Sequence, residues 1–258
     1  MDRNKIAALV VWLVSTALLE WAAYAAREAL FGVRGAEQAV VVDDAFMLLA
    51  YLSIPVFTLV WVMLGVSIVR FRDHGGNQSP SDEQQLAKFQ LAKFHAKWAW
   101  SWLLWSSSLC LLVMIIPGWT GMQELRSTSD ETADLTIEVT GIRWMWQFYY
   151  KDHDVWLRNP KENLVLPNES LIRFKVTAHD QDVLHSFWIP AFRQKIDAVP
   201  GLITTIDVTT NRIGSFAKDP DYRVQCAELC GVGHSVMSQP VQVVGKSEFA
   251  DWITTKRE

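Results

Sequence analysis

The chain has 258 residues, half of them apolar, with 13 Trp and a formal net charge of −4. The length allows one large domain or two smaller ones, and the clustering of the apolar residues indicates a membrane part joined to a soluble part. Up to Gly118 the chain has nine acidic and nine basic residues, which cancel, and after Gly118 it has nineteen acidic and fifteen basic residues. The acidic excess therefore lies in the C-terminal half. An acidic domain argues against a nucleic-acid partner and suits a basic protein partner.

Three stretches are long and apolar enough for membrane helices, which need roughly 20 apolar residues each. They are Ile6–Ala26, Phe46–Val69 and Trp98–Trp119. The first also has the basic start and the small-residue end of a cleaved signal peptide, but its apolar run is long for a signal core. We therefore expect it to be retained, and the anchor to have two to three helices.

Basic residues between the second and third stretches indicate the orientation, because such residues favour the cytoplasmic side. They are Arg70, Arg72, Lys88, Lys93 and Lys97. Residues 74–85 are predicted to form a solvated loop, and residues 84–97 to extend the third helix. The expected parts are 1–45, an N-terminal helix and external linker; 46–118, a transmembrane hairpin with a cytoplasmic loop; and 119–258, an extracytoplasmic domain.

From about Leu135 the pattern changes to the alternation typical of strands, as in "LTIEVTGIRWMWQFYY". Residues 163–181, 202–211 and 222–229 predict further short strands separated by Pro, Gly and Asn turns. These features predict an all-β sandwich or Greek-key barrel of about 130 residues. The closing residues 247–258 predict a short helix.

The segment "CAELCGVGHSVM" gathers Cys226, Cys230, His234 and Met237 within twelve residues. Thiolate, imidazole and thioether together favour copper over hard cations. Three other interpretations compete: a disulfide outside the cytoplasm, a structural zinc site, and simple packing with the Met in the core. The remaining cysteine, Cys110, lies in an apolar run and is predicted to be a small buried hydrophobic residue.

A second imidazole is available in "HDQDVLHSFWIP", at His185. Two Cys, two His and one Met are too many ligands for one tetrahedral ion, but they suit two ions that share the thiolates. Each ion would then have two bridging sulfurs and one imidazole, with weaker axial ligands completing the set.

The C-x-E-x-C-G-x-x-H-x-x-M form of this segment resembles the dinuclear copper loop of cytochrome c oxidase subunit II. "DVLHSFWIPAF", "KIDAVPG" and "WMW" match the same family in the same order. The resemblance covers about Leu135 to Trp252 and implies a cupredoxin-like Greek-key barrel behind a transmembrane helical anchor.

The resemblance also implies a centre of two copper ions (CuA), in which two thiolates bridge the ions and one imidazole caps each. The weak axial ligands are a thioether and a backbone carbonyl. The implied ligands are His185, Cys226, Cys230, His234, Met237 and the carbonyl of Glu228. The Glu228 carboxylate is expected to face a magnesium ion at the boundary with subunit I, as suits a hard oxygen ligand.

Alternation along a strand places Trp144, Trp146, Phe148 and Tyr150 on one face, which for most of them predicts a core stripe. The resemblance gives Trp144 alone the role of receiving the electron from cytochrome c. Acidic side chains that would ring a docking site for a basic donor are Asp180, Asp182, Asp219 and Asp221. Each of these is otherwise an ordinary solvated residue.

The family implies subunit II of a haem–copper cytochrome c oxidase in a bacterial plasma membrane, with its C-terminal domain on the periplasmic or extracellular side. Such a chain accepts electrons from cytochrome c or a similar one-electron donor and passes them to haem in subunit I. Oxygen is reduced to water there, coupled to proton translocation. The implied partners are subunit I, other oxidase subunits and membrane lipid. The alternatives are the copper subunit of a nitric oxide reductase and a non-enzymatic membrane-tethered copper or zinc binder.

The sequence departs from the family pattern at several positions. Met145 stands between the two Trp, where an aromatic residue is usual, and Leu202 replaces the Arg that often follows "DAVPG". His95, three residues before Trp98, stands where many relatives have the Glu of a proton pathway. These departures put the proton pathway in question and leave the copper ligands intact. No C-x-x-C-H occurs, so the chain carries no haem c attachment motif.

Overall fold

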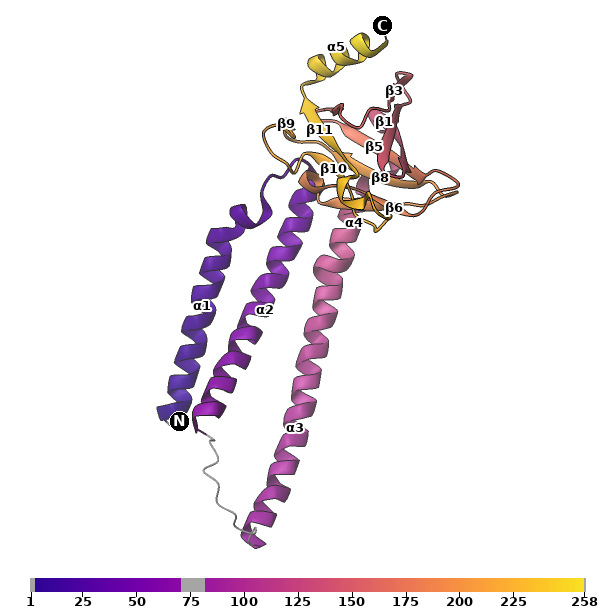
Figure 1. Cartoon of the computed structure of the whole chain (residues 1–258). Helices are drawn as coiled ribbons and strands as arrows, with labels where there is room; N and C mark the ends of the chain where they lie inside the picture. The colour runs from indigo at the N-terminus through magenta and orange to yellow at the C-terminus, as the bar shows by residue number, and fades with distance from the viewer. Residues whose placement is uncertain (1–2, 71–81, 258) are drawn as a thin grey trace. The chain divides into compact units, whose positions relative to one another are not determined.

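The computed structural model describes residues 3–70 and 82–257, which belong to two compact units (Figure 1). One unit consists of Met1–Ala26 with Phe46–Met122, and the other of Arg27–Ala45 with Gln123–Glu258. The first is helical and the second is mainly β. Most of the predicted loop at 74–85 lies outside the described residues.

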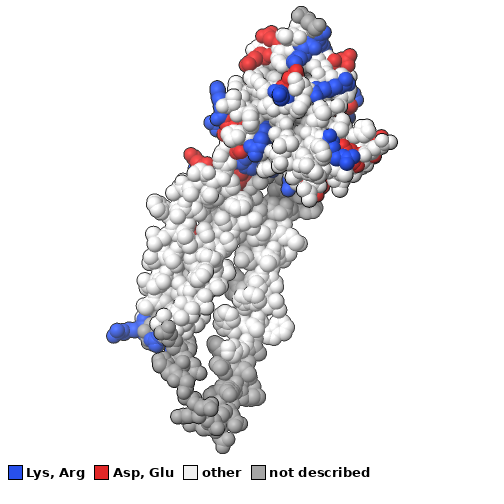
Figure 2. Space-filling view, viewed as in Figure 1, with Lys and Arg blue, Asp and Glu red and all other residues white. Residues whose placement is uncertain are grey.

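Long helices make up the first unit. They are α1 (Arg3–Phe31), α2 (Glu37–Arg70) and α3 (Asp82–Val113), followed by the π-helical turn η1 (Met114–Trp119) and by α4 (Thr120–Arg126). The end of α1, the start of α2 and the end of α4 belong to the second unit. Three spans have a mean hydropathy of 1.9, 2.3 and 1.8, and at most 6% of each apolar window is buried. Charged side chains gather on the β domain in Figure 2, whereas the described part of the helices is almost free of them. These helices are long and apolar enough to cross a membrane, where lipid takes the place of a protein core.

The first two helices make polar contacts with each other. The indole Nε1 of Trp12 donates to the carbonyl of Pro55 at 2.8 Å, and the hydroxyls of Thr16 and Thr58 lie 2.7 Å apart. Such contacts satisfy polar groups inside an apolar phase. That α1 is retained stays a prediction. Cys110 is exposed, so the prediction that it is buried was wrong, because none of the apolar window of this span is buried by protein.

The third membrane segment continues beyond its predicted end at Trp119, through α4 and the 3-10 turn η2 (Ser127–Asp130). The helical geometry breaks at Ile116, with φ −127° and ψ 111°. Ile116 precedes Pro117, and a residue before proline is pushed from the helical to the extended region. The predicted extension of α3 toward its N-terminus is confirmed, since the helix begins at Asp82.

Two sheets form the β domain. One has the order β3-β2-β1-β5-β8 and the other β4-β11-β10-β6-β7, with β9 paired to β11. The first contains β1 (Leu135–Ile142), β2 (Met145–Tyr150), β3 (Val155–Leu157), β5 (Leu171–Ala178) and β8 (Thr204–Thr209). The second contains β4 (Leu164–Pro167), β6 (His185–Ile189), β7 (Gln194–Ala198), β9 (Gly214–Ser215), β10 (Arg223–Cys226) and β11 (Ser238–Val244). Strand pairs β1–β5 and β4–β11 are parallel and the others antiparallel.

Short helices complete the domain. They are the 3-10 turns η3 (Pro190–Phe192) and η4 (His234–Val236) and the C-terminal helix α5 (Lys246–Arg257), which was predicted. Residues before the first strand also belong to this domain, since Ala36 is fully buried in its core and pairs with Thr210.

Alternating burial along the strands forms the core between the sheets, as the alternating sequence predicts. In β2, Trp146, Phe148 and Tyr150 are fully buried, which confirms the core stripe for them. Trp144 does not share that face. It lies in the turn before β2, because the strand begins only at Met145, so its predicted place on one strand face with these three residues was wrong. Its exposed fraction is 41%, which agrees with setting Trp144 apart from the residues predicted to form the core. The predicted β-sandwich is confirmed.

Candidate metal centre

The predicted ligand segment forms the loop that joins β10 to β11. The two strands are antiparallel, with Gln225 opposite Ser238. The backbone N–H of Cys226 donates to the carbonyl of Met237 at 3.0 Å and closes the base of the loop. Cys226 and Met237 therefore lie side by side, and Cys230 and His234 are carried in the loop between them.

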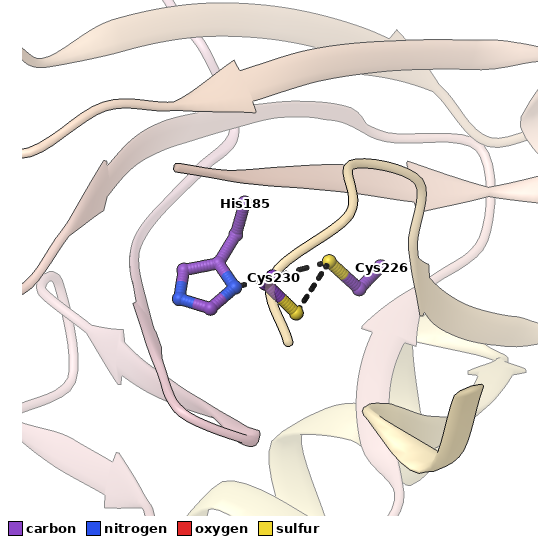
Figure 3. Close-up of side chains that lie close together, drawn as sticks. All are labelled: His185, Cys226 and Cys230. Carbon is purple, nitrogen blue, oxygen red and sulfur yellow. Dashed lines mark hydrogen bonds between the residues drawn. The ribbon is translucent and has the colours of Figure 1, made fainter. Parts of the chain in front are cut away.

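His185 reaches the loop from the neighbouring strand. It is the first residue of β6, and β6 pairs with β10 so that Phe187 lies opposite Cys226. The N–H of Ala227 also donates to the carbonyl of Ser186 at 3.0 Å. This pairing brings the His185 Nδ1 to 3.8 Å from the Sγ of Cys226, across 41 residues of sequence (Figure 3).

All the predicted donor atoms gather around the two thiols. The Sγ atoms of Cys226 and Cys230 are 3.8 Å apart, as Figure 3 shows. The Sγ of Cys230 lies 3.6 Å from the Nδ1 of His234 and 3.9 Å from the Sδ of Met237. The Sγ of Cys226 lies 3.2 Å from the carbonyl oxygen of Glu228. The sequence-predicted ligands thus form one cluster of soft and intermediate donors.

This geometry fits a metal site. Both loop cysteines are free thiols, and their 3.8 Å separation is far from the ~2.05 Å of a disulfide bond. Two sulfurs bound to one ion at ~2.3 Å with a tetrahedral angle lie ~3.8 Å apart. The ligand atoms of His185, Cys226 and Cys230 all lie within 4.8 Å of one another. The arrangement therefore suits metal binding, and it excludes a disulfide in this structure.

Burial sets the protonation of the donors. His185 and Met237 are fully buried, and the two thiols nearly so. Burial lowers the pKa of His185, which keeps the imidazole neutral and able to bind a metal. Burial, together with the neighbouring Cys226, raises the pKa of the Cys230 thiol. A cation that binds here must displace the thiol protons, so metal binding releases protons.

Asp182 lies behind His185, on the side away from the thiols. Its Oδ2 is 3.7 Å from the His185 Nε2, while the Nδ1 faces Cys226. Asp182 is held by an ion pair with Arg143 (2.6 Å) and by the backbone N–H groups of Arg143 and Val183 (both 2.7 Å). Burial by itself would raise the pKa of Asp182, but these hydrogen bonds and the guanidinium hold the pKa below its usual value. A carboxylate here favours the tautomer that leaves Nδ1 free for a metal.

The prediction that Asp182 belongs to an exposed docking ring was therefore wrong. Its side chain is only 5% exposed, because Arg143 and the β6 strand cover it. Asp180 is exposed, whereas Asp219 and Asp221 are half-buried. Docking by these three stays a prediction.

Trp144 packs on the outside of the loop. Its indole Nε1 donates to the carbonyl of Cys230 at 3.1 Å. Gly233 makes room for the ring, since a Cβ at this position would lie 2.4 Å from a ring carbon. The ring thus connects the protein surface with the backbone of a predicted ligand. The Glu228 side chain is exposed, and the surface around it is apolar, with Leu229, Val232 and Val236 largely exposed.

The supporting residues were missed by sequence reasoning. Gly141, inside β1, has a signal that could have revealed its role, because glycine within a strand often marks a close approach. A Cβ at this position would lie 3.0 Å from the His185 ring. The role of Asp182 had a weaker signal, its place three residues before a predicted ligand.

Comparison with known proteins relates this arrangement to one family. Residues 154–244 match the profile of the cytochrome c oxidase subunit II periplasmic domain. A probable cytochrome c oxidase subunit 2 of Rickettsia bellii is 33% identical over 168 residues, which is 58% of this chain and 59% of the relative. An alternative cytochrome c oxidase subunit 2 of Bradyrhizobium diazoefficiens is 25% identical over 241 residues, covering 84% of this chain and 80% of the relative.

Among solved structures, the periplasmic domain of subunit II of cytochrome oxidase from Bradyrhizobium japonicum is 34% identical. The match covers 49% of this chain and 95% of that one, with a TM-score of 0.43. The chain spans about half the length of the first curated relatives that it matches.

The fold and the site together define a class: a cupredoxin-like β domain, joined to apolar helices, that gathers thiol, imidazole and thioether groups in one place. Within that class, residues 154–244 belong to the family of the cytochrome c oxidase subunit II periplasmic domain, and the curated relatives of the chain are oxidase subunits 2. The family implies copper, and the cluster of His185, Cys226 and Cys230 has the donors to bind a metal.

Proposed function

We propose that this chain is the electron-accepting subunit of a haem–copper cytochrome c oxidase and that it holds two copper ions. The observation that carries the proposal is the convergence of two thiols, two imidazoles, a thioether and a carbonyl within hydrogen-bonding and van der Waals distance of one another. The thioether ligand favours copper over zinc, and so many donors exceed the needs of one tetrahedral ion.

The proposed ligands have different roles at the copper centre. The thiolates of Cys226 and Cys230 and the imidazoles of His185 and His234 would hold the two ions. The thioether of Met237 and the carbonyl of Glu228 would be the weaker ligands. When bound, the copper pair supplies a one-electron redox centre whose charge is shared by two metals. The buried β scaffold would hold the ligands in place during oxidation and reduction, and Asp182 would orient the His185 ring.

Trp144 is the proposed point at which electrons from cytochrome c, or from a similar donor, reach the centre. Its partial exposure and its hydrogen bond to the Cys230 carbonyl support this role. Exposed apolar residues of the loop would contact the donor, and Asp180, Asp219 and Asp221 would steer a basic donor. Electrons would leave toward haem in subunit I, where oxygen is reduced to water and protons are translocated.

The apolar helices support a multi-pass location in a bacterial plasma membrane, with the β domain on the periplasmic or extracellular side. The proposed partners are subunit I, further oxidase subunits and membrane lipid. The exposed Glu228 carboxylate would face a magnesium ion at the boundary with subunit I. The role of His95 in proton uptake also stays a prediction.

The full chain, purified in detergent and loaded with copper, tests the metal centre. We expect two coppers per chain and a seven-line hyperfine pattern by electron paramagnetic resonance, since one electron is shared by two copper nuclei. Cys226→Ser should abolish this spectrum, and Cys110→Ser is the matched control that should retain it. A four-line spectrum of a single copper, or one zinc per chain, would contradict the dinuclear centre.

Isolation of the chain from its native membrane tests the oxidase role. Copurification with a large haem-bearing membrane protein that consumes oxygen is expected. Consumption of nitric oxide instead would indicate a nitric oxide reductase. Isolation of the copper-loaded chain without any partner would indicate a membrane-tethered copper carrier.

A further inference from the structure

Apart from the candidate metal centre, the β domain has a strongly basic cavity. It has a volume of about 760 Å³ and is formed largely by β5, β7 and β8 and by the segment around α4. Its cationic side chains are Arg126, Arg173, Lys175, Arg193 and Lys195, and Asp207 is its one acidic residue among those described. All of its lining residues belong to the β-domain unit.

Two of the five cations are already neutralised. Arg173 pairs with Asp207 through two contacts, of 2.8 and 2.7 Å, and Arg193 pairs with Asp43 at 3.0 Å. For Arg126, Lys175 and Lys195, in contrast, no ion pair occurs among the described residues. The cavity thus carries an excess of about three positive charges at neutral pH.

Buried hydrogen-bond donors at the same cavity lack partners. The Nη2 of Arg193 and the Nε2 of Gln194 are both buried, and neither has a hydrogen-bond partner in the described part of the chain. Native proteins rarely leave buried donors unsatisfied, because such a donor has lost its hydrogen bonds to water and gained none in return. Two such donors beside three uncompensated cations therefore point to an anionic ligand with several acceptor oxygens.

The nature of the anion follows from its surroundings. Val42 lies in α2, four residues before the apolar stretch that begins at Phe46, and Leu125 and Arg126 lie in α4, after the apolar stretch that ends at Trp119. Arg126 follows the apolar stretch ending at Trp119 by seven residues, roughly 10 Å of helix, which is comparable to the headgroup layer of a bilayer. The cavity is also larger than an inorganic anion needs and falls within the size range of sites for organic ligands.

We propose that this cavity binds a phosphate group, and its position in the chain points to an anionic phospholipid headgroup as the carrier. The guanidinium of Arg193 and the amide of Gln194 would donate to phosphate oxygens, and Lys175 and Lys195 would balance the charge. The site is separate from the proposed copper ligands, and none of those ligands lines it.

The test uses the full chain in a nonionic detergent and native mass spectrometry, in which the mass of the adduct identifies the ligand. Dihexanoyl phosphatidylglycerol and inorganic phosphate are titrated separately. The variant K175Q/K195Q removes two cations at the cavity, and K218Q/K246Q is the matched control, since both of its lysines are exposed and neither lines the cavity.

We expect one phosphatidylglycerol per chain in the parent and in K218Q/K246Q, and a Kd at least about tenfold higher in K175Q/K195Q. Binding of inorganic phosphate alone, with the same dependence on the two lysines, would support the phosphate site and identify a free ion as its ligand. Equal Kd values in the two double variants, or no adduct with either probe, would overturn the proposal. If K175Q/K195Q does not fold, R126Q replaces it, because Arg126 is exposed and lies outside the sheets.

Discussion

Gly233 lies beneath the ring of Trp144, and adding one methyl group there tests how the ring is held. A Cβ at this position would lie 2.4 and 2.5 Å from two ring carbons. Carbon atoms in contact are normally about 3.5–4.0 Å apart. In Gly233→Ala, the ring and the loop must therefore separate by about 1 Å.

The ring is expected to move rather than the loop. The loop backbone is held by hydrogen bonds from His234 N–H to the Gly231 carbonyl and from Val236 N–H to the Gly233 carbonyl, at 3.1 and 3.2 Å. Trp144 is 41% exposed and can swing outward. Its 3.1 Å hydrogen bond to Cys230 would then break, at a cost of about 0.5–1.5 kcal/mol.

Lost packing adds to this cost, so the total destabilisation should be about 1–3 kcal/mol. For a domain of this size that corresponds to a fall in Tm of roughly 2–12 °C. Both coppers should remain bound, because the ligand loop keeps its hydrogen bonds. The rate of electron transfer from reduced cytochrome c, measured by stopped-flow absorbance, should fall because the ring no longer contacts the loop.

Gly245→Ala is the matched control, since a Cβ there would meet nothing within 4 Å. A double-mutant cycle with Trp144→Leu isolates the clash, because Gly233→Ala should cost almost nothing once the ring is gone. The reasoning is refuted if Gly233→Ala leaves both Tm and the electron-transfer rate at parental values. Loss of copper would show instead that the loop yields and the ring stays.

Three further substitutions test the surroundings of the site and the attachment of residues 27–45. Asp182→Asn should lower the copper affinity about 10–100-fold in a chelator competition, because the His185 ring loses its neighbouring carboxylate. The control Asp180→Asn should leave the affinity unchanged, and equal effects of the two substitutions would contradict the orienting role of Asp182. Met237→Leu should change the reduction potential of the copper centre in a redox titration, and both coppers should stay bound. The stability cost should be below about 1.5 kcal/mol. Loss of a copper would show that the thioether is more than a weak ligand. Asp43→Asn should destabilise the domain by on the order of 3 kcal/mol in thermal melting, because two guanidinium groups lose their buried counter-charge. The control Asp44→Asn changes an exposed residue and should alter the stability by no more than about 0.5 kcal/mol. Similar melting of the two variants would rule out a stabilising role for the ion pairs.

Local patterns were sufficient to predict much of the fold. Apolar length predicted the three membrane helices, and alternation predicted β1, β2, β5 and β8. Strands β6, β7 and β11 were not predicted, because their own sequences alternate weakly and they become strands by pairing with neighbours. The turn before β2 was also missed, and for that reason Trp144 was placed within the strand, on the same face as Trp146.

The same division applies to the candidate site. Cys226, Cys230, His234 and Met237 lie within one hairpin loop, so their spacing alone predicts that they come together. Asp182 was expected at the surface, since a single Asp carries no local sign of burial. Its burial follows from the ion pair with Arg143, which comes from a different part of the chain.

The sequence by itself determined the apolar spans, the strand-rich C-terminal half and the set of donor side chains. These are properties of composition, period and spacing, which act over a few residues. Only the tertiary structure decided that β6 pairs with β10, which carries His185 to the thiols, and that Arg193 and Gln194 have buried, unpartnered donors and line a basic cavity. Strand order and side-chain burial depend on how all the elements share one core, so no short segment contains that information.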